Sequence, residues 1–158
     1  LYVACSDAAP LDSNDAVRTA LTDWFADKTP PNTTLTINDF TPIYPVIHVE
    51  VTTRAGYDST VVKNDVYKAI VDLLSFDNVS FNDTITQADI QTAAGTYSIP
   101  GVQDLKITRF ENQSTLTDPT NADGTVTSTT KLVYNIDEIP IAITDSTTPN
   151  FILVKDAS

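Results

Sequence analysis

The sequence predicts an α+β fold, in which two small strand–helix–strand units pack together and a strand-rich C-terminal extension follows. Two segments carry apolar residues at spacings of three and four, which is typical of amphipathic helices. Several shorter segments alternate apolar and polar residues, as half-buried strands do. Hydrophobic residues make up 41% of the 158 residues, which is enough for a packed core. We place the first unit at residues 1–43, the second at 44–110 and the C-terminal part at 111–158.

The first unit contains a helix between two predicted strands. Leu1–Cys5 alternates as a strand does, and Thr34–Ile37 predicts the second strand. Between them, Asp15–Lys28 predicts a helix that Pro30 and Pro31 end. The apolar residues of this helix share one face, which we expect to be buried in the core: Val17, Ala20, Leu21, Trp24 and Phe25.

The second unit begins with the clearest strand of the chain, Tyr44–Arg54, after an expected kink at Pro42. Asp58 or Ser59 then caps a helix over Thr60–Ser75. The residues on one face of the strand are Ile47, Val49 and Val51, and those on the other are Val46, His48 and Glu50. The buried stripe expected for the helix is Val62, Val66, Tyr67, Ile70, Val71 and Leu74.

The rest of this unit is shorter and more irregular. Phe76–Asp83 is an irregular segment in which Val79 and Phe81 suggest a short strand. Thr86 and Asp89 form a capping box for a helix over residues 87–94 that stops near Gly95. The closing elements are a turn over Ile99–Gly101 and a strand over Asp104–Phe110 with Leu105 and Ile107 on one face.

The C-terminal part is predicted to be a loop followed by strands. Glu111–Thr130 is rich in Thr, Asn, Asp and Ser, so we expect a long loop or hairpin tip. Asp137 and Glu138 fall between two strands and predict a turn. The expected strands are Lys131–Tyr134, Ile139–Ile143 and Phe151–Val154.

The charge of the chain argues against two classes of partner. Nine basic and 21 acidic residues give a formal net charge of −12. The basic residues are scattered, and their tightest grouping is Lys63 with Lys68, so the clusters that bind nucleic acid or anionic membranes are missing. No apolar run reaches the roughly 18 residues of a membrane-spanning helix. We therefore expect no nucleic-acid partner and no membrane insertion.

The residues that commonly carry catalysis or metal binding are few. His48 is the single histidine and lies within a predicted strand, where a half-exposed structural role is expected. Cys5 is the single cysteine and shares a face with apolar residues, so it is expected in the core. One Cys and one His cannot form a zinc site. The four glycines are isolated, so no phosphate-binding loop is predicted: Gly56, Gly95, Gly101 and Gly124.

The acidic residues do not single out a site either. Asp118, Asn121 and Asp123 come nearest to a calcium loop, but their spacing misses the alternate ligand positions of an EF-hand. Asp12, Asn14 and Asp15 fit the start of a helix, where negative charge suits the dipole. No pair among the 21 acids stands out as a catalytic pair. We expect no enzyme activity, no catalytic or metal-binding residues and no cofactor.

The order of the elements resembles one family, the baseplate J-like proteins of bacteriophage tails. Four parts of the chain carry the resemblance and together span nearly all of it. They are Lys28–Pro31 with Thr34–Ile37; Tyr44–Val51 with Ala55–Asp58; Ile85–Ile90 with Ile99–Val102 and Asp104–Ile107; and Asn135–Pro140. The first part resembles the family's proline-bearing turn and short strand, and the second resembles its "pVdV.v.v...gyd" passage. The third resembles its "v.GV..v.i" turn and strand, and the fourth resembles its closing "eiP".

The resemblance implies a structural subunit that assembles into the wedge or ring around the tail hub. It implies location in the virion, assembly in the bacterial cytoplasm, a homo-oligomeric ring and partners among hub, wedge and fibre proteins. Family members carry no catalytic residues. The chain begins with Leu1 and lacks Met, so we expect it to be the C-terminal portion of a longer wedge protein. The polar stretch Gln113–Thr130 is longer than the family pattern explains.

Two other functions stay open at this point. A binding module of an extracellular or virion surface, such as an adhesin or carbohydrate-binding domain, would suit the acidic, Thr-rich composition. Such modules are mostly all-β sandwiches, whereas this sequence predicts two strong helices. An enzyme that uses two ordinary carboxylates is the third hypothesis.

Overall fold

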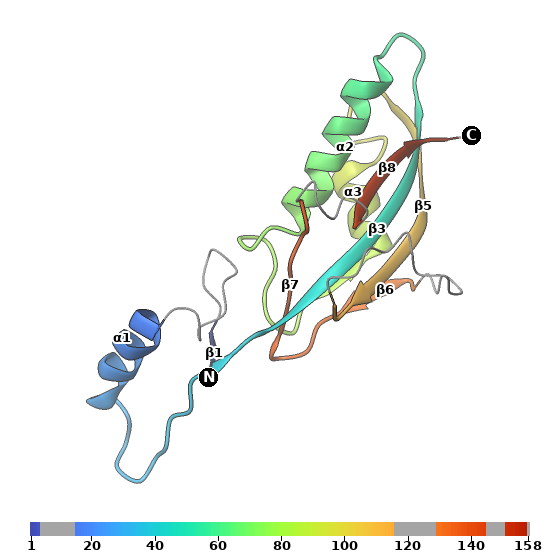
Figure 1. Cartoon of the computed structure of the whole chain (residues 1–158). Coiled ribbons are helices and arrows are strands. Elements are labelled where there is room, and N and C mark those ends of the chain that lie inside the picture. The colour runs from blue at the N-terminus through green and yellow to red at the C-terminus, as the bar shows by residue number, and fades with distance from the viewer. Residues whose placement is uncertain (4–14, 116–128, 145–150, 158) are drawn as a thin grey trace.

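The computed structural model describes residues 1–3, 15–115, 129–144 and 151–157, and it confirms the predicted α+β class. The helices are α1 (Asp15–Ala26), α2 (Ser59–Leu73) and α3 (Gln87–Ala94). The strands are β1 (Tyr2–Val3), β2 (Asn38–Asp39), β3 (Thr41–Thr53), β4 (Thr84–Thr86), β5 (Val102–Gln113), β6 (Lys131–Val133), β7 (Glu138–Pro140) and β8 (Ile152–Asp156). Figure 1 shows β3 as the long central strand on which the other elements are arranged.

The main sheet is built around β3. On one side β3 pairs antiparallel with β5, from Tyr44 opposite Gln113 to Thr53 opposite Val102. On its other side it pairs in parallel with β7 at residues 41–43 and with β8 at residues 47–51. Two shorter pairs complete the structure, β1 with β2 in parallel and β4 with β6 antiparallel. The C-terminal strands β7 and β8 therefore both pair with β3.

A β-bulge in β5 keeps its apolar residues on the core side. Val49 lies opposite Ile107 and His48 opposite Arg109, so Thr108 is an extra residue with no partner of its own. Without it, Phe110 would project from the opposite face, because side chains alternate along a strand. With it, Phe110 lies opposite Ile47 and is fully buried.

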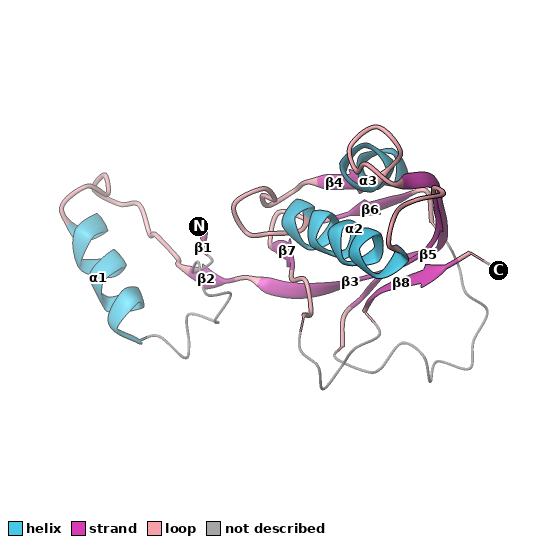
Figure 2. Ribbon diagram, turned by 90° about the horizontal axis from the view of Figure 1, so that it is seen from above, coloured by secondary structure: helices cyan, strands magenta, loops and turns pink. Residues whose placement is uncertain are grey.

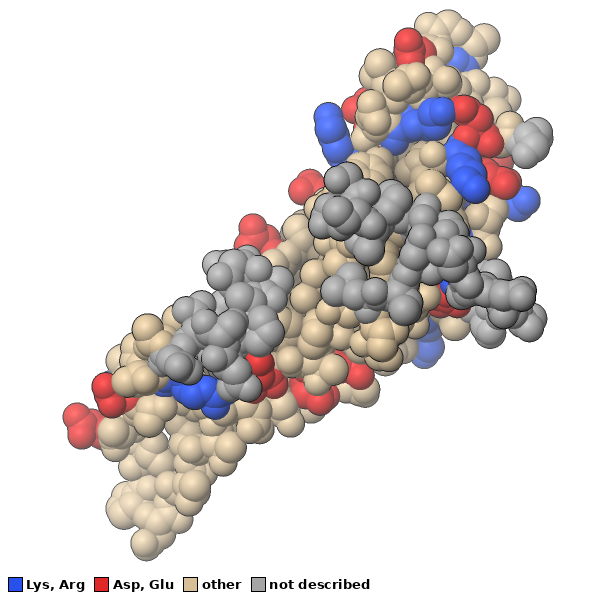
Figure 3. All heavy atoms as spheres, viewed as in Figure 1, with Lys and Arg blue, Asp and Glu red and all other residues tan. Residues whose placement is uncertain are grey.

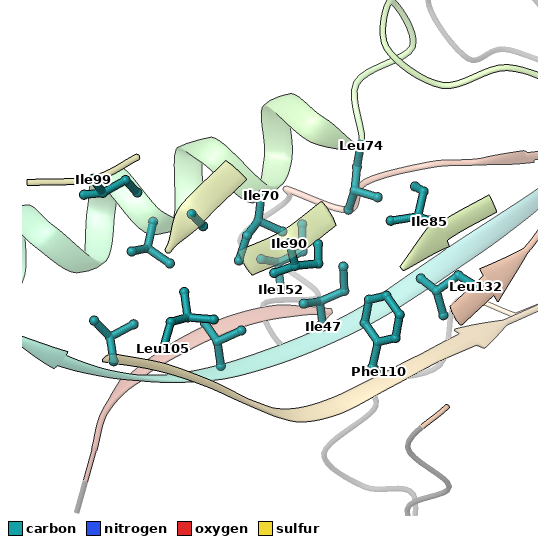
Figure 4. Close-up of a cluster of buried hydrophobic side chains, with 14 of the residues drawn as sticks. Ile47, Ile70, Leu74, Ile85, Ile90, Ile99, Leu105, Phe110, Leu132 and Ile152 are labelled. Atoms are coloured by element: carbon teal, nitrogen blue, oxygen red, sulfur yellow. The ribbon is translucent and has the colours of Figure 1, made fainter. Parts of the chain in front are cut away.

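Helices α2 and α3 cover one face of the sheet, as Figure 2 shows from above. Side chains from both helices, the sheet and the β4–β6 pair meet in a single core (Figure 4). The fully buried members include Ile47, Ile70, Leu74, Ile90, Phe110 and Leu132. Four of the six residues in the predicted stripe of α2 are buried, namely Val62, Val66, Ile70 and Leu74, whereas Tyr67 and Val71 are only partly buried against the core.

The starts of α2 and α3 follow the sequence closely. The Asp58 carboxylate accepts the backbone N–H groups of Thr60 and Val61, at 2.8 and 3.2 Å. Thr86 and Asp89 form the predicted capping box, in which the side chain of each accepts from the backbone N–H of the other. These bonds satisfy amide groups that a helix start would otherwise leave unpaired.

The N-terminal arm, defined as β1, α1, β2 and the residues that connect α1 to β2, lies apart from the body, defined as β3 to β8. In both ribbon views α1 lies away from α2 and α3 (Figures 1 and 2). Polar bonds within the arm hold its first strand against the residues that lead into β2. The Leu1 ammonium group donates to the Thr36 carbonyl at 3.0 Å, and the Asn38 amide donates to the Leu1 carbonyl at 2.9 Å.

Two predictions near the junction of arm and body are wrong. Thr34–Ile37 is not a strand, because no described strand pairs with it, and the short strand β2 follows at Asn38–Asp39. No kink interrupts the chain at Pro42, since β3 begins at Thr41 and runs through it. The backbone hydrogen bonds between β3 and the chain around β7 use the amide of Thr41 and the carbonyl of Ile43. Pro42, which has no N–H group, is therefore tolerated at this position of the strand.

Several other boundaries moved. Neither Val79 nor Phe81 lies in a strand, whereas the strand β4 at Thr84–Thr86 was not predicted. Residues 111–113 of the predicted polar loop extend β5, residues 114, 115, 129 and 130 lie outside any strand, and residues 116–128 lie outside the described residues. The strand predicted at 139–143 is β7 at 138–140, so Glu138 belongs to a strand and only Asp137 to a turn. The unit boundaries 43/44 and 110/111 fall inside β3 and β5.

Candidate protein–protein interface

One face of α1 is apolar and is not covered by any described part of the chain. Its members are Ala16, Val17, Ala20, Leu21, Trp24 and Phe25, which line one continuous apolar surface. From Ala16 to Ala26 none of the helix residues is buried, and 56% of Trp24 is exposed. The expectation that Trp24 belongs to the core is therefore wrong. The periodicity correctly identified an apolar face, but none of the residues that the structure describes covers it.

The Trp24 ring is held in place although it is exposed. The Phe25 ring meets it edge-on, with centroids 4.7 Å apart. The Lys28 ammonium group lies 4.0 Å from the centroid of the indole, which is a cation–π distance, and it also donates to the Trp24 carbonyl at 2.9 Å. An aromatic side chain fixed in this way loses little conformational freedom when a partner covers it.

The neighbouring side of α1 faces its own connection to β2. Arg18 donates from its guanidinium group to the Ile37 carbonyl at 2.9 Å. A groove of about 520 Å³ runs between α1 and residues 33–37 and is lined mainly by threonines and the edges of Phe25, Leu35 and Ile37. Arg18 thus ties α1 to its connection, and Phe25 lines both this groove and the apolar face.

The body carries a second apolar surface, the α2–β7 groove, at the end of α2 that lies beside the chain leaving β7. Its volume is about 220 Å³. The lining residues are Val71, Leu74, Ser75, Phe76, Pro140, Ile141, Ala142 and Thr144. Six of these eight residues are apolar, so the groove could receive an apolar side chain from a partner.

The charged side chains are distributed differently from these apolar surfaces. On the face shown in Figure 3, Lys and Arg gather mainly at the upper end of the body and are interleaved with Asp and Glu. Lys63 pairs with Asp156 at 2.6 Å, and Lys106 pairs with Glu50 at 3.5 Å. Arg109 is buried and pairs with Glu111, two residues further along the same strand β5. Lys63 is therefore engaged in an ion pair, and no basic patch forms from Lys63 and Lys68.

The residues weighed for chemistry do not come together in a site. His48 is half-buried in β3, as expected, and lies opposite Arg109 in the sheet. Among the described residues no group of three or more His, Cys, Asp or Glu side chains could hold a metal ion. The following residues lie outside the described part: Cys5, Asp12, Asn14, Asp118, Asn121, Asp123 and Gly124.

One ionisable group has a strongly shifted pKa, but it lies in the core. Burial of Tyr134 raises the pKa of its phenol well above the ordinary value, and the nearby carboxylates of Asp83 and Glu138 add to this effect. Its hydroxyl group lies 3.3 Å from Asn112 Oδ1, the amide oxygen that accepts its hydrogen bond. The group is fully buried, so the shift reflects packing and not a reactive site.

Comparison with known proteins adds no family. No protein-family model matches the chain, and no curated protein matches its sequence. Within the described ranges, no helix has the length and apolar character that crossing a membrane requires. The apolar face of α1 and the α2–β7 groove are thus the surfaces on which a functional argument can rest.

Proposed function

We propose that this protein is a structural subunit of a bacteriophage tail baseplate, which assembles through protein–protein interfaces into the wedge or ring around the tail hub. The observation that carries the proposal is the uncovered apolar face of α1. It holds a half-exposed, pre-positioned Trp24 on an arm that lies apart from the body. Tryptophan is among the residues that most often dominate binding energy at protein interfaces.

The order of elements supports the same proposal. Three of the four stretches that resemble baseplate J-like proteins fall on consecutive parts of the body, from β3 through the start of α2 and α3 to β5 and β7, whereas the first lies in the arm and lacks the expected strand at Thr34–Ile37. Gly101 in the "GV" turn has φ of +99°, a conformation that favours glycine, so this motif has a structural role here. An extracellular binding module has less support, because α2 and α3 contribute much of the core and all-β sandwiches have no such helices.

The proposal is tested by asking where the protein is found and what it binds. Purified phage particles should contain its peptides by mass spectrometry, and the tagged chain should capture other tail proteins from infected cells. Trp24→Asp should reduce that capture, because a charge on the apolar face opposes desolvation. Tyr97→Asp, at an exposed aromatic residue outside the arm, is the matched control. Absence from virions together with no captured tail protein would contradict the proposal.

A further inference from the structure

We infer that the outer edge of β8 binds an extended peptide segment of another protein, which adds a strand to the main sheet and places an acidic side chain beside Lys155. The inference goes beyond the proposed function, because it rests on the edge of the sheet alone. In this mode of recognition, main-chain hydrogen bonds supply the affinity and alternate side chains supply the specificity.

The strand β8 lies at the edge of the sheet and pairs in parallel with β3, its one partner among the described strands. At the start of this ladder the Ile47 amide donates to the Phe151 carbonyl at 2.7 Å. At its end the Ala157 amide donates to the Val51 carbonyl at 3.0 Å. Alternate residues of β8 therefore bond to β3, and the residues between them direct their N–H and C=O groups to the other side. The outward residues are Ile152, Val154 and Asp156.

The outward main-chain groups of β8 have no hydrogen-bond partner in the described part of the chain. Each of the three residues offers one N–H and one C=O group, repeated at every second position. A second extended chain presents matching groups at the same spacing, which is why such edges attract strands. The opposite edge, along β5, is partly used, since the Phe110 carbonyl accepts from the Thr129 amide at 2.9 Å. The open row on β8 therefore favours an extended backbone as its partner.

The helix α2 packs against β8 on the core side of the sheet. Lys63, Tyr67 and Val71 are spaced four apart and so form one row along this helix. Lys63 donates to the Asp156 carboxylate at 2.6 Å, which places the row along β8. Tyr67 and Val71 are half-buried and border a surface hollow of about 430 Å³. Every second side chain of an added strand would face this flank of α2, which favours apolar residues at those positions.

The face of the sheet away from the helices determines the charge that the partner should carry. Glu50 of β3 has two partners in the ladders, Lys106 on β5 and Lys155 on β8. Glu50 pairs with Lys106 at 3.5 Å, whereas Lys155 forms no ion pair with a described residue. The signs thus run positive, negative and positive across the three strands. An acidic residue on the added strand continues this series, because opposite charges on neighbouring strands stabilise their pairing and like charges oppose it.

The other charges near this edge do not change the preference. Lys68 and Asp72 both border the hollow on α2 and have opposite signs. Asp156 is already paired with Lys63. Lys155 therefore sets the sign of the residue that an added strand should place beside it.

Two labelled peptides that differ only in charge test the inference with the purified chain. They are Thr-Val-Glu-Val-Glu-Val-Thr and Thr-Val-Lys-Val-Lys-Val-Thr, whose side-chain order is the same from either end, so the pattern suits a parallel or an antiparallel strand. In fluorescence polarisation the Glu peptide should bind at least about fivefold more tightly, because attraction to Lys155 replaces repulsion. The net charge of −12 alone would favour the Lys peptide, so nonspecific attraction predicts the opposite order.

Charge variants locate the preference on the strand. Lys155→Glu should reverse the order of the two peptides. Lys131→Glu is the matched control, because it makes the same charge change at an exposed residue of β6, and it should leave the order unchanged. Equal effects of the two variants would show that the net charge and not the β8 edge selects the peptide.

The main-chain bonds are tested from both sides. The Glu peptide with all of its amides N-methylated has no N–H group to donate and should bind at least about tenfold more weakly, since the carbonyls of the edge lose their partners. Val154→Pro should weaken binding of the unmodified Glu peptide similarly, because it removes an outward N–H that β3 does not use. Circular dichroism checks that this variant is folded, and the methylated peptide gives the same test on the wild-type chain.

Three results would overturn the inference: tighter binding of the Lys peptide, equal binding of the methylated and unmodified Glu peptides, or binding of neither peptide. A second copy is the competing occupant. If the wild-type chain associated with itself in sedimentation velocity and Val154→Pro abolished this association, the edge would belong to a contact between copies and the inference would fail. None of these results depends on whether the protein occurs in virions, so the proposed function stands or falls separately.

Discussion

The helices α1 and α2 have the same kind of sequence pattern and opposite surroundings. In α2 the apolar stripe Val62, Val66 and Ile70 is at most 2% exposed, because the sheet and α3 pack against it. In α1 the equivalent stripe stays on the surface, and Trp24 is 56% exposed. An amphipathic pattern therefore shows that a helix has a face to bury, but it does not show which molecule buries it.

The difference has a physical origin in the strands around each helix. α2 connects β3 to elements that return to the same sheet, so its apolar face meets a surface of the same chain. α1 connects β1 and β2, which are two residues long and form no broad face. A pair of strands this small cannot cover a helix of 12 residues. The described residues of the arm thus form a helix and two short strands, but they do not bury the apolar face of that helix.

The largest effect is expected from truncating the same kind of side chain in the two helices. Ile70→Ala should lower the free energy of unfolding by about 2–5 kcal/mol, because it leaves a cavity in the core. Leu21→Ala in α1 should change it by less than about 1 kcal/mol, since Leu21 is only half-buried and alanine favours helix. Urea unfolding followed by far-UV circular dichroism measures both values.

The single tryptophan allows arm and body to be followed separately in the same experiment. Trp24 fluorescence reports on the arm, whereas circular dichroism is dominated by the body. Ile70→Ala should shift the dichroism midpoint and leave the arm's fluorescence at zero denaturant unchanged. Equal losses of stability from Ile70→Ala and Leu21→Ala would show instead that α1 is packed as tightly as α2.

A smaller effect is expected in the turn that leads into β5. Gly101 has φ of +99°, and an added Cβ would lie 2.6 Å from a Tyr57 ring carbon and 2.8 Å from a Val62 methyl group. Gly101→Ala should therefore cost about 1–3 kcal/mol for the close contact in addition to the backbone strain. Gly56→Ala is the matched control, because Gly56 has φ of +92° and no atom within 4 Å of the added Cβ.

The comparison of the two glycine variants measures how tightly the body is packed at the turn that leads into β5. The difference between their unfolding midpoints removes the shared backbone strain and leaves the contact with Tyr57 and Val62. If Gly56→Ala were as destabilising as Gly101→Ala, close packing at this turn would be disproved and strain alone would explain the glycines.

The elements that were predicted well are those whose signals are local. Asp58 and the pair Thr86 and Asp89 marked two helix starts, because capping depends on residues three positions apart. The face of β3 formed by Ile47 and its neighbours followed from strict alternation.

The features that were missed depend on distant parts of the chain. Leu35 lies in an alternating segment but is 39% exposed, because no described strand pairs with it. Pro42 fits in β3 only because β7, almost a hundred residues later, uses the Thr41 amide and the Ile43 carbonyl. The α2–β7 groove joins α2 to residues after β7, so no short motif could have revealed it. The extra residue Thr108 reverses the alternation of β5 in a way that only pairing with β3 shows.

The smallest expected effect concerns the interior of the body at high pH. Tyr134 is fully buried, and burial raises its pKa above the ordinary value of 10.0. In the unfolded chain the phenol loses its proton near pH 10, whereas in the folded chain the phenol stays protonated at that pH. Above that pH the unfolded state binds fewer protons, so the free energy of unfolding should fall, by about 1 kcal/mol at pH 11 from this group. Tyr134→Phe should remove that part of the decrease and cost at most about 1 kcal/mol near pH 7 through the lost bond to Asn112. If the free energies of unfolding of the two proteins instead changed equally between pH 8 and 11, Tyr134 would ionise as readily in the folded chain as in the unfolded chain. The body would then be more open to water than its packing indicates.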